Sequence, residues 1–353
     1  MRAAAVVAAC LAATVAAPAT AEGARALPLE GWLGINADFS GRSLVWTEAA
    51  TVRLNPATNP GRLPPGLSPF VYYRVHGSSA ALDGARRRFR GAVEQPVAVR
   101  TQIARMSAGQ VVGDGRGGFV MVPGARRFAA PVIWCCEDGV ETVIHSDGRA
   151  DAPVPLAAGA DGAVVRSLLR HADGTVVLTT SDPAEVLPRP SEVPFPGRPA
   201  PNLAAVAARI VAWVDEDARR TLRIGRPTDA GIAAERRVGL PGRALRVWAD
   251  RGLVVVAVRQ GSGVRLVRID GLAGPVRSIW RGRGVPRVGL GEGTVAAAKG
   301  RTLLAAGRGR LRVVARARGA VAAVAAARGR VAWFERIRRP DGRRTVVRIG
   351  RIR

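Results

Sequence analysis

The segment 329–351, GRVAWFERIRRPDGRRTVVRIGR, recurs upstream at 209–226 as RIVAWVDEDARRTLRIGR. In both copies a short apolar run, Val-Ala-Trp-Phe or Val-Ala-Trp-Val, leads through a charged turn to a second run that ends in Arg-Ile-Gly-Arg. Such short runs, rich in β-branched residues and bounded by turns, are typical of β-hairpins. The sequence therefore contains a duplicated hairpin.

Weaker copies of this hairpin also carry a tryptophan in an apolar run, at Trp46 and Trp134. With Trp213 and Trp333 of the clear copies, the successive intervals are 88, 79 and 120 residues. These intervals lie near small multiples of roughly 40 residues, the length of a four-stranded propeller blade. We therefore expect an all-β chain that forms a single β-propeller, with these four tryptophans as repeat-core markers. Seven blades are favoured, and six or eight are the alternatives.

The apolar runs also indicate how each strand is buried. All four residues of 331–334, Val-Ala-Trp-Phe, are apolar, so both faces of a strand formed there would be apolar. This predicts a strand covered on both faces, as in a blade between two neighbours. The Ala-rich segment 319–328 could form a helix, but its position predicts the innermost strand of the last blade. The chain ends after what we expect to be the third strand of that blade, so the segment Ala24–Leu29 is the candidate for closing the ring.

Residues 55–117 interrupt the repeat. They begin with a proline-rich stretch at 55–69 and include a basic stretch at 85–90, Ala-Arg-Arg-Arg-Phe-Arg. The alternatives are an ordered insertion, a degraded blade or disorder. Long irregular segments in compact domains are usually functional or disordered, so we consider this irregular insertion the favoured place for a specificity loop.

The N-terminus predicts export. Residues 1–21 contain one arginine, an apolar core and Ala19-Thr20-Ala21, a small-residue cleavage site of the kind found in signal peptides. We expect cleavage near Ala21 and a secreted or extracytoplasmic propeller domain over residues 22–353. A lipid anchor at Cys10 is less favoured, because acylation there would leave a short apolar stretch. No later segment reaches the roughly 18 apolar residues of a membrane span.

The chain is strongly basic, with 54 Lys and Arg against 27 Asp and Glu and a net charge of +27. Lys299 is the only lysine, so the sequence favours arginine throughout, as the codons of a GC-rich genome would. We favour this compositional explanation of the positive charge over a specific anionic ligand. A general attraction to anionic surfaces is expected in either case. A specific nucleic-acid partner is not expected.

The phrase at 36–46, Asn-Ala-Asp-Phe-Ser-Gly-Arg-Ser-Leu-Val-Trp, resembles the repeat of TolB-like secreted propellers, in which a turn of Ser, Asp and Gly precedes an apolar strand ending in an aromatic residue. The segment 326–333 is a looser copy. The family's Pro-Asp-Gly occurs once, at 340–342, in a different turn. The resemblance implies the propeller fold and export, and a binding or scaffold role more often than catalysis.

Few residues indicate chemistry. Cys135 and Cys136 are adjacent, and the alternatives for them are a strained vicinal disulfide or two free thiols. The carboxylates at 215–217 could bind a cation or act as an acid/base pair, but a solvated hairpin turn is the favoured interpretation. The three histidines are scattered, and no phosphate loop, zinc spacing or nucleophile elbow occurs. No cofactor, metal or catalytic residue is predicted.

The function favoured by the sequence is an exported, non-enzymatic and monomeric propeller that acts as a binding or scaffold module for a protein or an anionic envelope polymer. The alternative is a propeller enzyme, a hydrolase or a lyase, with its site in the central channel. Three or more polar side chains that converge on a pocket in this channel would favour the enzyme. A channel lined by Ala and Val would count against it.

Overall fold

The computed structural model describes residues 24–29, 34–41, 43–52, 72–81, 95–98, 110–122, 132–135, 141–145, 153–162, 164–182, 191–339 and 342–352. Among these residues every paired strand is antiparallel to its neighbours, and none of the residues is helical. In particular, the part of the chain that the structure describes contains no helix long and apolar enough to cross a membrane.

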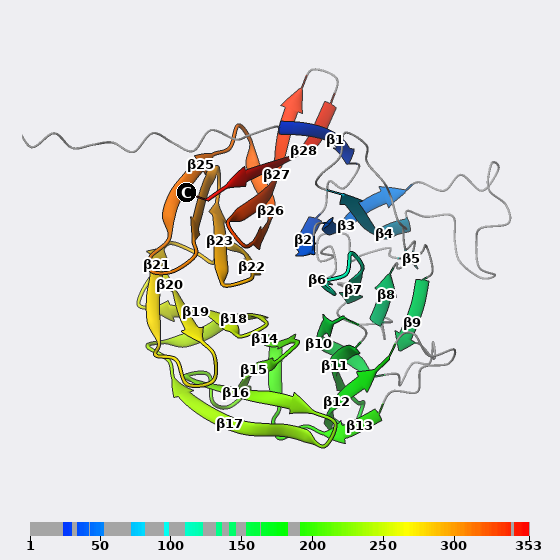
Figure 1. The fold of residues 1–353 in the computed structure, drawn as a ribbon, viewed down its shortest axis with the longest axis vertical. Helices are drawn as coiled ribbons and strands as arrows, with labels where there is room; N and C mark the ends of the chain where they lie inside the picture. The colour runs from blue at the N-terminus through cyan, green and yellow to red at the C-terminus, as the bar shows by residue number, and fades with distance from the viewer. Residues whose placement is uncertain are drawn as a thin grey trace, which may run out of the picture.

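The described strands form seven four-stranded sheets, which stand around a central axis (Figure 1). In each sheet the first strand lies nearest the axis, and the later strands follow toward the rim. This radial arrangement of sheets is a β-propeller, in which each sheet is one blade. The prediction of an all-β propeller is confirmed.

The first three blades are built from the first half of the chain. Blade 1 contains β2 (Gly34–Ser40), β3 (Ser43–Val52), β4 (Tyr72–Ala81) and β5 (Gln95–Ala98). Blade 2 contains β6 (Gln110–Gly113), β7 (Phe119–Val122), β8 (Val132–Cys135) and β9 (Glu141–His145). Blade 3 contains β10 (Val154–Asp161), β11 (Val164–Arg170), β12 (Val176–Ser181) and β13 (Ser191–Pro194).

The remaining four blades follow in chain order. Blade 4 contains β14 (Pro199–Ala207), β15 (Ile210–Asp215), β16 (Thr221–Thr228) and β17 (Gly231–Gly239). Blade 5 contains β18 (Arg243–Asp250), β19 (Leu253–Gln260), β20 (Gly263–Asp270) and β21 (Arg277–Gly282). Blade 6 contains β22 (Arg287–Gly291), β23 (Thr294–Lys299), β24 (Thr302–Ala306) and β25 (Arg312–Arg316). Blade 7 contains β26 (Ala320–Ala327), β27 (Arg330–Arg339), β28 (Gly342–Arg351) and β1 (Ala24–Leu29).

The last sheet has strands from both ends of the chain. Its order is β26, β27, β28, β1, and Ala24 of β1 pairs with Arg348 of β28. The segment for which the sequence suggested ring closure therefore lies beside the C-terminal strand. In such a pairing β1 covers the edge that β28 would otherwise expose.

The second strand of each blade is packed on both faces. The five residues 254–258 of β19, which follow Leu253 and are all Val or Ala, are buried without exception, and β15 is buried from Ile210 to Val214. Neighbouring blades supply the two covers, since separate apolar clusters join blade 4 to blade 5 and blade 5 to blade 6. Apolar and polar residues do not alternate in these strands because both faces of each strand are buried.

Small residues let the first strands approach one another at the axis. A Cβ atom on Gly113 would overlap the carbonyl oxygen of Phe39, and one on Gly289 would overlap that of Val324. The Ala-rich segment 320–327 is a strand, β26, as its position indicated. Alanine and glycine are thus selected here by space and not by helix propensity.

The tryptophan markers do not all occupy equivalent positions. Trp46, Trp213 and Trp333 lie on the second strand of blades 1, 4 and 7 and are almost completely buried. Trp134, however, lies on β8, the third strand of blade 2. The second strand of that blade is β7, which has Phe119 and no tryptophan, so the weak copy around Trp134 is one strand out of phase with the others.

The interrupted region 55–117 contributes ordered strands to two blades. β4 and β5 complete the outer half of blade 1, and β6 begins blade 2. Similarly, the proline-rich segment 181–201 includes β13, a short outer strand. Prolines are tolerated there because an outer edge strand has a row of N–H groups without ladder partners.

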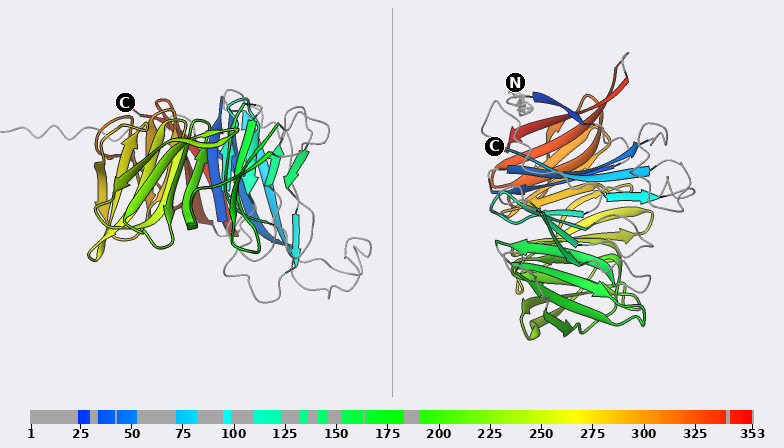
Figure 2. Two further views of the ribbon diagram at one scale, coloured as in Figure 1. Left: turned by 90° about the horizontal axis from the view of Figure 1, so that it is seen from below. Right: turned by 90° about the vertical axis from the view of Figure 1, so that its right-hand side faces the viewer.

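The strands run between two faces of the disc (Figure 2). We call one the inner-hairpin face, because it carries the turns from the first to the second strand, such as 251–252 and 292–293. The other is the linker face, which carries the connections between blades and the turns from the second to the third strand. At the linker face, Ala317 N–H in the link to blade 7 donates to Arg301 O in the turn of blade 6 at 2.8 Å.

Candidate functional site

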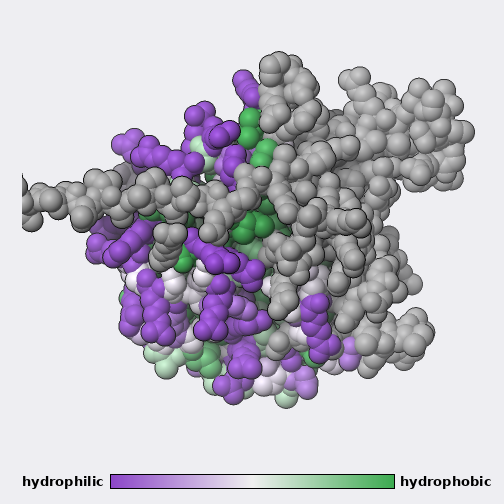
Figure 3. Space-filling model, turned by 45° about the horizontal axis from the view of Figure 1, so that its top comes forward, coloured by the Kyte–Doolittle hydropathy of each residue, from purple (hydrophilic) through white to green (hydrophobic). Residues whose placement is uncertain are grey.

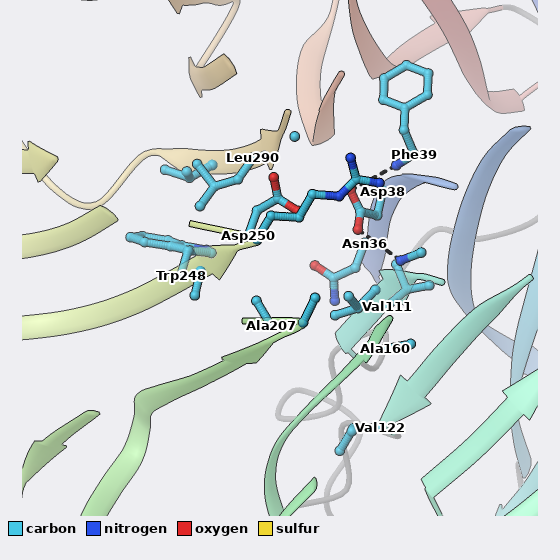
Figure 4. Close-up of a pocket in the computed structure, with 18 of the residues that line it drawn as sticks. Asn36, Asp38, Phe39, Val111, Val122, Ala160, Ala207, Trp248, Asp250 and Leu290 are labelled. Carbon is cyan, nitrogen blue, oxygen red and sulfur yellow. Dashed lines mark hydrogen bonds between the residues drawn. The ribbon is translucent and has the colours of Figure 1, made fainter. Parts of the chain in front are cut away.

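A cavity of about 560 Å³ lies at the propeller axis. All seven first strands, β2, β6, β10, β14, β18, β22 and β26, contribute residues to its wall. The first strands end at the inner-hairpin face, so the turns of that face surround the mouth. In Figure 4, Asp38 and Asp250 extend into the space between β2 and β18. The cavity is of the size that holds small organic ligands.

Asp38 is the most perturbed acid of this cavity. Its carboxylate accepts hydrogen bonds from the N–H of Phe39 at 2.8 Å and from the N–H of Gly113, on β6, at 2.9 Å. Burial raises the pKa of Asp38 to about 8, and the negative charge of Asp250 adds to this increase, although the two amides and Arg251 oppose it. Asp38 is therefore mainly protonated at neutral pH.

Asp250 approaches the same space from the end of β18. Its Oδ2 accepts a hydrogen bond from the N–H of Glu292 at 2.9 Å, which links blade 5 to blade 6. Burial raises the pKa of Asp250 as well, more than this amide and the nearby Arg251 lower it. Arg251 itself pairs with Glu292, with Nη1 and Oε1 at 3.4 Å. Among the described residues, neither Asp38 nor Asp250 has a cationic side chain within ion-pair distance.

A buried network beside the mouth fixes the position of β2 relative to β6. Ser40 Oγ donates to Asp114 Oδ1 at 2.7 Å and accepts from the N–H groups of Gly115 and Gly117 at 3.0 and 2.9 Å. Asp114 Oδ1 also accepts from the N–H of Gly118 at 3.0 Å. Ser40 and Asp114 are 0% and 4% exposed, so each bond is made away from water and is correspondingly strong. The network holds Asp38, two residues before Ser40, in place.

The wall beside Asp250 is mixed. Trp248 and Leu290 are apolar (Figure 4). The guanidinium of Arg246 lies 5.2 Å from the centre of the Trp248 ring. Asn202 has a positive φ of 62°, an uncommon conformation for a residue other than glycine. Such backbone outliers are concentrated at functional sites in known proteins. The cavity thus combines an aromatic surface with several polar groups.

Asp38 and Asp250 were not singled out by the sequence. Asp38 stands in the TolB-like phrase, and Asp250 in an Asp-Arg-Gly turn that looks like many other hairpin turns. Their separation along the chain conceals their proximity at the axis. The signal that could have found them is positional, because both are acids near the end of a first strand, where the ring converges.

The residues that the sequence did single out lie elsewhere. Cys136 and the side chain of Cys135 lie outside the described residues, so the vicinal disulfide stays a prediction. Of the carboxylates at 215–217, Glu216 and Asp217 lie exposed in the turn after β15, as the favoured interpretation had it, whereas Asp215 ends β15 and its side chain is only 14% exposed. There Asp215 pairs with Arg223 at 3.0 Å and Glu216 pairs with Arg170 at 3.0 Å. Both acids therefore have structural partners.

Four arginines, Arg53, Arg223, Arg268 and Arg348, recur at a similar point of their repeat units, and those that the structure describes are neutralised within the fold. Arg223 makes a two-point contact with Glu235, at 2.7 Å for each nitrogen, and lies 4.8 Å from the ring centre of Trp213. Arg268 contacts Asp270, and Arg348 contacts Glu335 at 2.8 Å. Arg53 lies outside the described residues. These arginines hold blades together and do not form a surface for anions.

Metal ligation has no candidate in the described residues, since they contain no group of three or more His, Cys, Asp or Glu side chains arranged to hold an ion. His171, for instance, has Nε2 at 3.7 Å from Glu192 Oε2. That pair joins the turn between β11 and β12 to β13 of the same blade.

No protein-family model and no curated protein matches the sequence. Solved structures do resemble the fold. The β-propeller domain of the Trilobed protease from Pyrococcus furiosus is similar with a TM-score of 0.54 at 10% identity, over 93% of this chain and 94% of that chain. A chain of the Mitotic Checkpoint Complex is similar with a TM-score of 0.53 at 12% identity, over 99% of each chain.

A puromycin-hydrolysing peptidase of Mycobacterium tuberculosis is similar with a TM-score of 0.52 at 16% identity, over 92% of this chain and 53% of that chain. The present chain thus spans about half the length of that peptidase. At these identities the likeness concerns the fold and not the activity. Together with the radial sheets, the comparisons identify the chain as a β-propeller.

Proposed function

We propose that this chain is a binding propeller whose axial cavity takes a small ligand with a protonated amine and an apolar body. The observation that carries the proposal is the meeting of Asp38 and Asp250 in one cavity without a cationic partner among the described residues. The charge of Asp250 raises the pKa of Asp38, so these two buried carboxyl groups resist simultaneous ionisation. A ligand cation bound between the two carboxylates removes the electrostatic cost of ionising both.

The rest of the cavity supports the chemistry of the ligand. Trp248 and Leu290 offer an apolar surface next to the carboxyl groups, which suits an amine carrying a hydrocarbon or aromatic group. The volume of about 560 Å³ admits a molecule of ordinary metabolite size. Arg251 pairs with Glu292 at 3.4 Å and is not within ion-pair distance of either carboxyl group, although its charge lowers the pKa of both.

Calorimetry with tryptamine as the probe tests this proposal. We expect binding at pH 7 to release a proton, because Asp38 ionises when the ammonium group arrives, so the measured enthalpy should vary with the ionisation enthalpy of the buffer. Asp38→Asn and Asp250→Asn should each weaken binding by about tenfold or more, as expected for removal of a buried charge partner.

Two controls separate the site from general effects. The uncharged analogue indole-3-ethanol should bind much more weakly than tryptamine to the wild type. Asp217→Asn, in the exposed turn after β15, removes an acid far from the axis and should leave binding unchanged. If tryptamine and indole-3-ethanol bound equally, the carboxyl groups would have no role in recognition and the proposal would be wrong.

The alternative is a propeller enzyme, a hydrolase or lyase, and one observation favours it. Several polar side chains do converge on the channel, and the pKa of Asp38 is raised enough for a general acid, with the carboxyl group of Asp250 in the same cavity. Chromatography of a bound candidate ligand after prolonged incubation distinguishes the two functions. Unchanged ligand favours binding, and products that disappear in Asp38→Asn favour catalysis.

We also propose that the chain is exported and that it is related to the TolB-like propellers. The signal sequence at 1–21 supports secretion, with the mature chain starting at Glu22. N-terminal sequencing of protein recovered from outside the producing cells tests this point, since a start at Met1 would contradict it. The peptidases among the similar structures support no transfer of a catalytic residue at their level of identity.

A further inference from the structure

Positive charge is arranged in an ordered row at the linker face of blade 5. Each of the four strands of this blade carries an arginine at or near its linker-face end: Arg243 on β18, Arg259 on β19, Arg265 on β20 and Arg281 on β21. Because neighbouring strands are about 4.8 Å apart, the row extends about 15 Å from the axis toward the rim. All but Arg265 are exposed.

Blade 6 repeats the arrangement. Arg287 begins β22, Lys299 ends β23, Arg301 precedes β24 and Arg316 ends β25, all at the linker face and all exposed. Lys299 Nζ would lie 2.8 Å from a Cβ atom on Gly284, in the link from blade 5, so the two rows are adjacent. We call the four residues of blade 5 and the four of blade 6 the basic sector.

Acidic residues are absent from this sector. Between 240 and 334 the sequence contains Asp250, Asp270 and Glu292 as its only acids. Each of them lies at the end of a strand or in a turn on the inner-hairpin face. Asp250 and Glu292 are at the cavity mouth, and Asp270 is paired with Arg268. The acids of this region therefore all lie toward the inner-hairpin face, and none of them lies within the basic sector.

The positions of the arginines oppose folding. Arg243 is directly paired with Arg259, and Arg265 with Arg281, in the registers of blade 5. Like charges opposite each other across two strands destabilise a sheet. In addition, Arg265 Nε is buried and makes no hydrogen bond. Residues that destabilise the blade and lack partners are better explained by a ligand than by stability.

We propose that the basic sector binds a linear, phosphate-bearing polyanion. Arginine forks match phosphate oxygens in two-point contacts, and a ladder of cations one strand apart can follow a chain of closely spaced anions. The described residues of this face form short turns and strand ends, with no helix that could enter the groove of a duplex. Hydrophilic residues also cover much of the described surface seen in Figure 3, with smaller apolar areas between them.

The test compares two variants that lose the same charge. Arg259, Arg281, Arg301 and Arg316 are changed to Gln in the sector variant. In the control variant Arg277, Arg308, Arg310 and Arg312 are changed to Gln, four residues of the same two blades that are exposed and lie toward the inner-hairpin face. Both variants therefore carry four positive charges fewer than the wild type.

Binding of fluorescent polyphosphate is measured by anisotropy between 50 and 200 mM salt. We expect the sector variant to bind at least about tenfold more weakly at low salt, and its slope of log K against log salt to be smaller in magnitude by about 3, as expected for four lost contacts to a single chain. The control variant should stay within about threefold of the wild type. Equal losses in both variants would show that net charge alone attracts the polymer, and would overturn the proposal.

Two further measurements keep the outcome unambiguous. Duplex DNA or vesicles with anionic lipid that bound the sector more tightly than polyphosphate at equal charge would overturn the assignment to a linear phosphate polymer. If the sector variant failed to fold, Arg281→Glu would replace it, since the new carboxylate lies opposite Arg265 and should stabilise the blade. That variant should still lose polyphosphate binding, and retained binding would contradict the proposal.

Discussion

Asp38 should make the stability of the propeller fall as the pH rises from acid to neutral. Its pKa is raised from 3.8 to about 8 in the folded chain, mainly by burial and then by the charge of Asp250. The folded state therefore keeps a proton that the unfolded state releases. The contribution of the protonated group is complete below the unfolded pKa and is lost as the pH rises through the folded value.

The magnitude follows from the size of the shift. Each pH unit within this window changes the free energy of unfolding by about 1.4 kcal/mol for one group. Between pH 5 and pH 8 the contribution of Asp38 should thus change by about 3 to 4 kcal/mol, with the slope decreasing as pH 8 is approached. Asp38→Asn removes the titration. The asparagine can also change the free energy of unfolding by an amount that does not depend on pH. That amount cancels when the difference between wild type and variant is compared across pH.

Urea unfolding followed by tryptophan fluorescence, at unit intervals from pH 5 to pH 8, measures this difference. The free energy of unfolding of the wild type should fall relative to that of Asp38→Asn over the interval. Asp173→Asn is the control, because its hydrogen bonds to Thr175 lower the pKa of Asp173 and place its titration below the window. A difference between wild type and Asp38→Asn that stays constant to within about 1 kcal/mol would refute the reasoning.

Three other predictions concern packing and ion pairs. Glu335→Gln should cost about 2 to 4 kcal/mol in urea unfolding, because Glu335 is 1% exposed and holds both Arg348 and Trp333 Nε1. Asp215→Asn should lower the free energy of unfolding by less than about 1 kcal/mol, since Arg223 keeps its ion pair with Glu235. Equal losses for Glu335→Gln and Asp215→Asn would contradict this account. Gly113→Ala should lower stability by about 2 kcal/mol or more through overlap with Phe39 O, whereas Gly239→Ala, with no atom near its Cβ position, should be close to neutral in the same melts. Removal of residues 24–29 should lower the melting temperature by exposing the edge of β28, and an unchanged melting temperature would show that β1 adds nothing.

Much of the fold could be predicted from local patterns. In blade 5 the sequence shows four apolar runs separated by glycine turns, and the strands β18 to β21 occupy these runs within a few residues. The pattern failed at Trp134, because blade 2 has short strands and places its tryptophan on the third one. A single aromatic marker does not specify the strand on which it lies when the flanking turns differ in length.

The candidate sites could not be predicted in the same way. Asp38 and Asp250 come from blades 1 and 5 and meet only because seven first strands share one axis. No pattern within one repeat contains that information. The basic sector was similarly hidden, since its residues alternate in sequence with apolar ones and become a row only when four strands lie side by side. The sequence correctly indicated an excess of arginine, and the fold determines where this excess collects.

The position of the acids of blades 5 and 6 on the inner-hairpin face has a consequence for both proposed ligands. A chain with a net charge of +27 repels an ammonium ligand at long range, so recognition of an amine must depend on charges within about a Debye length, roughly 10 Å at moderate salt. The acids at the inner-hairpin face provide such a local field, and the basic sector lies on the opposite face. A polyanion on that sector neutralises part of the repulsion without approaching the cavity. The two ligands therefore do not compete, and the arrangement allows the propeller to be held by an anionic polymer while its axial cavity remains open.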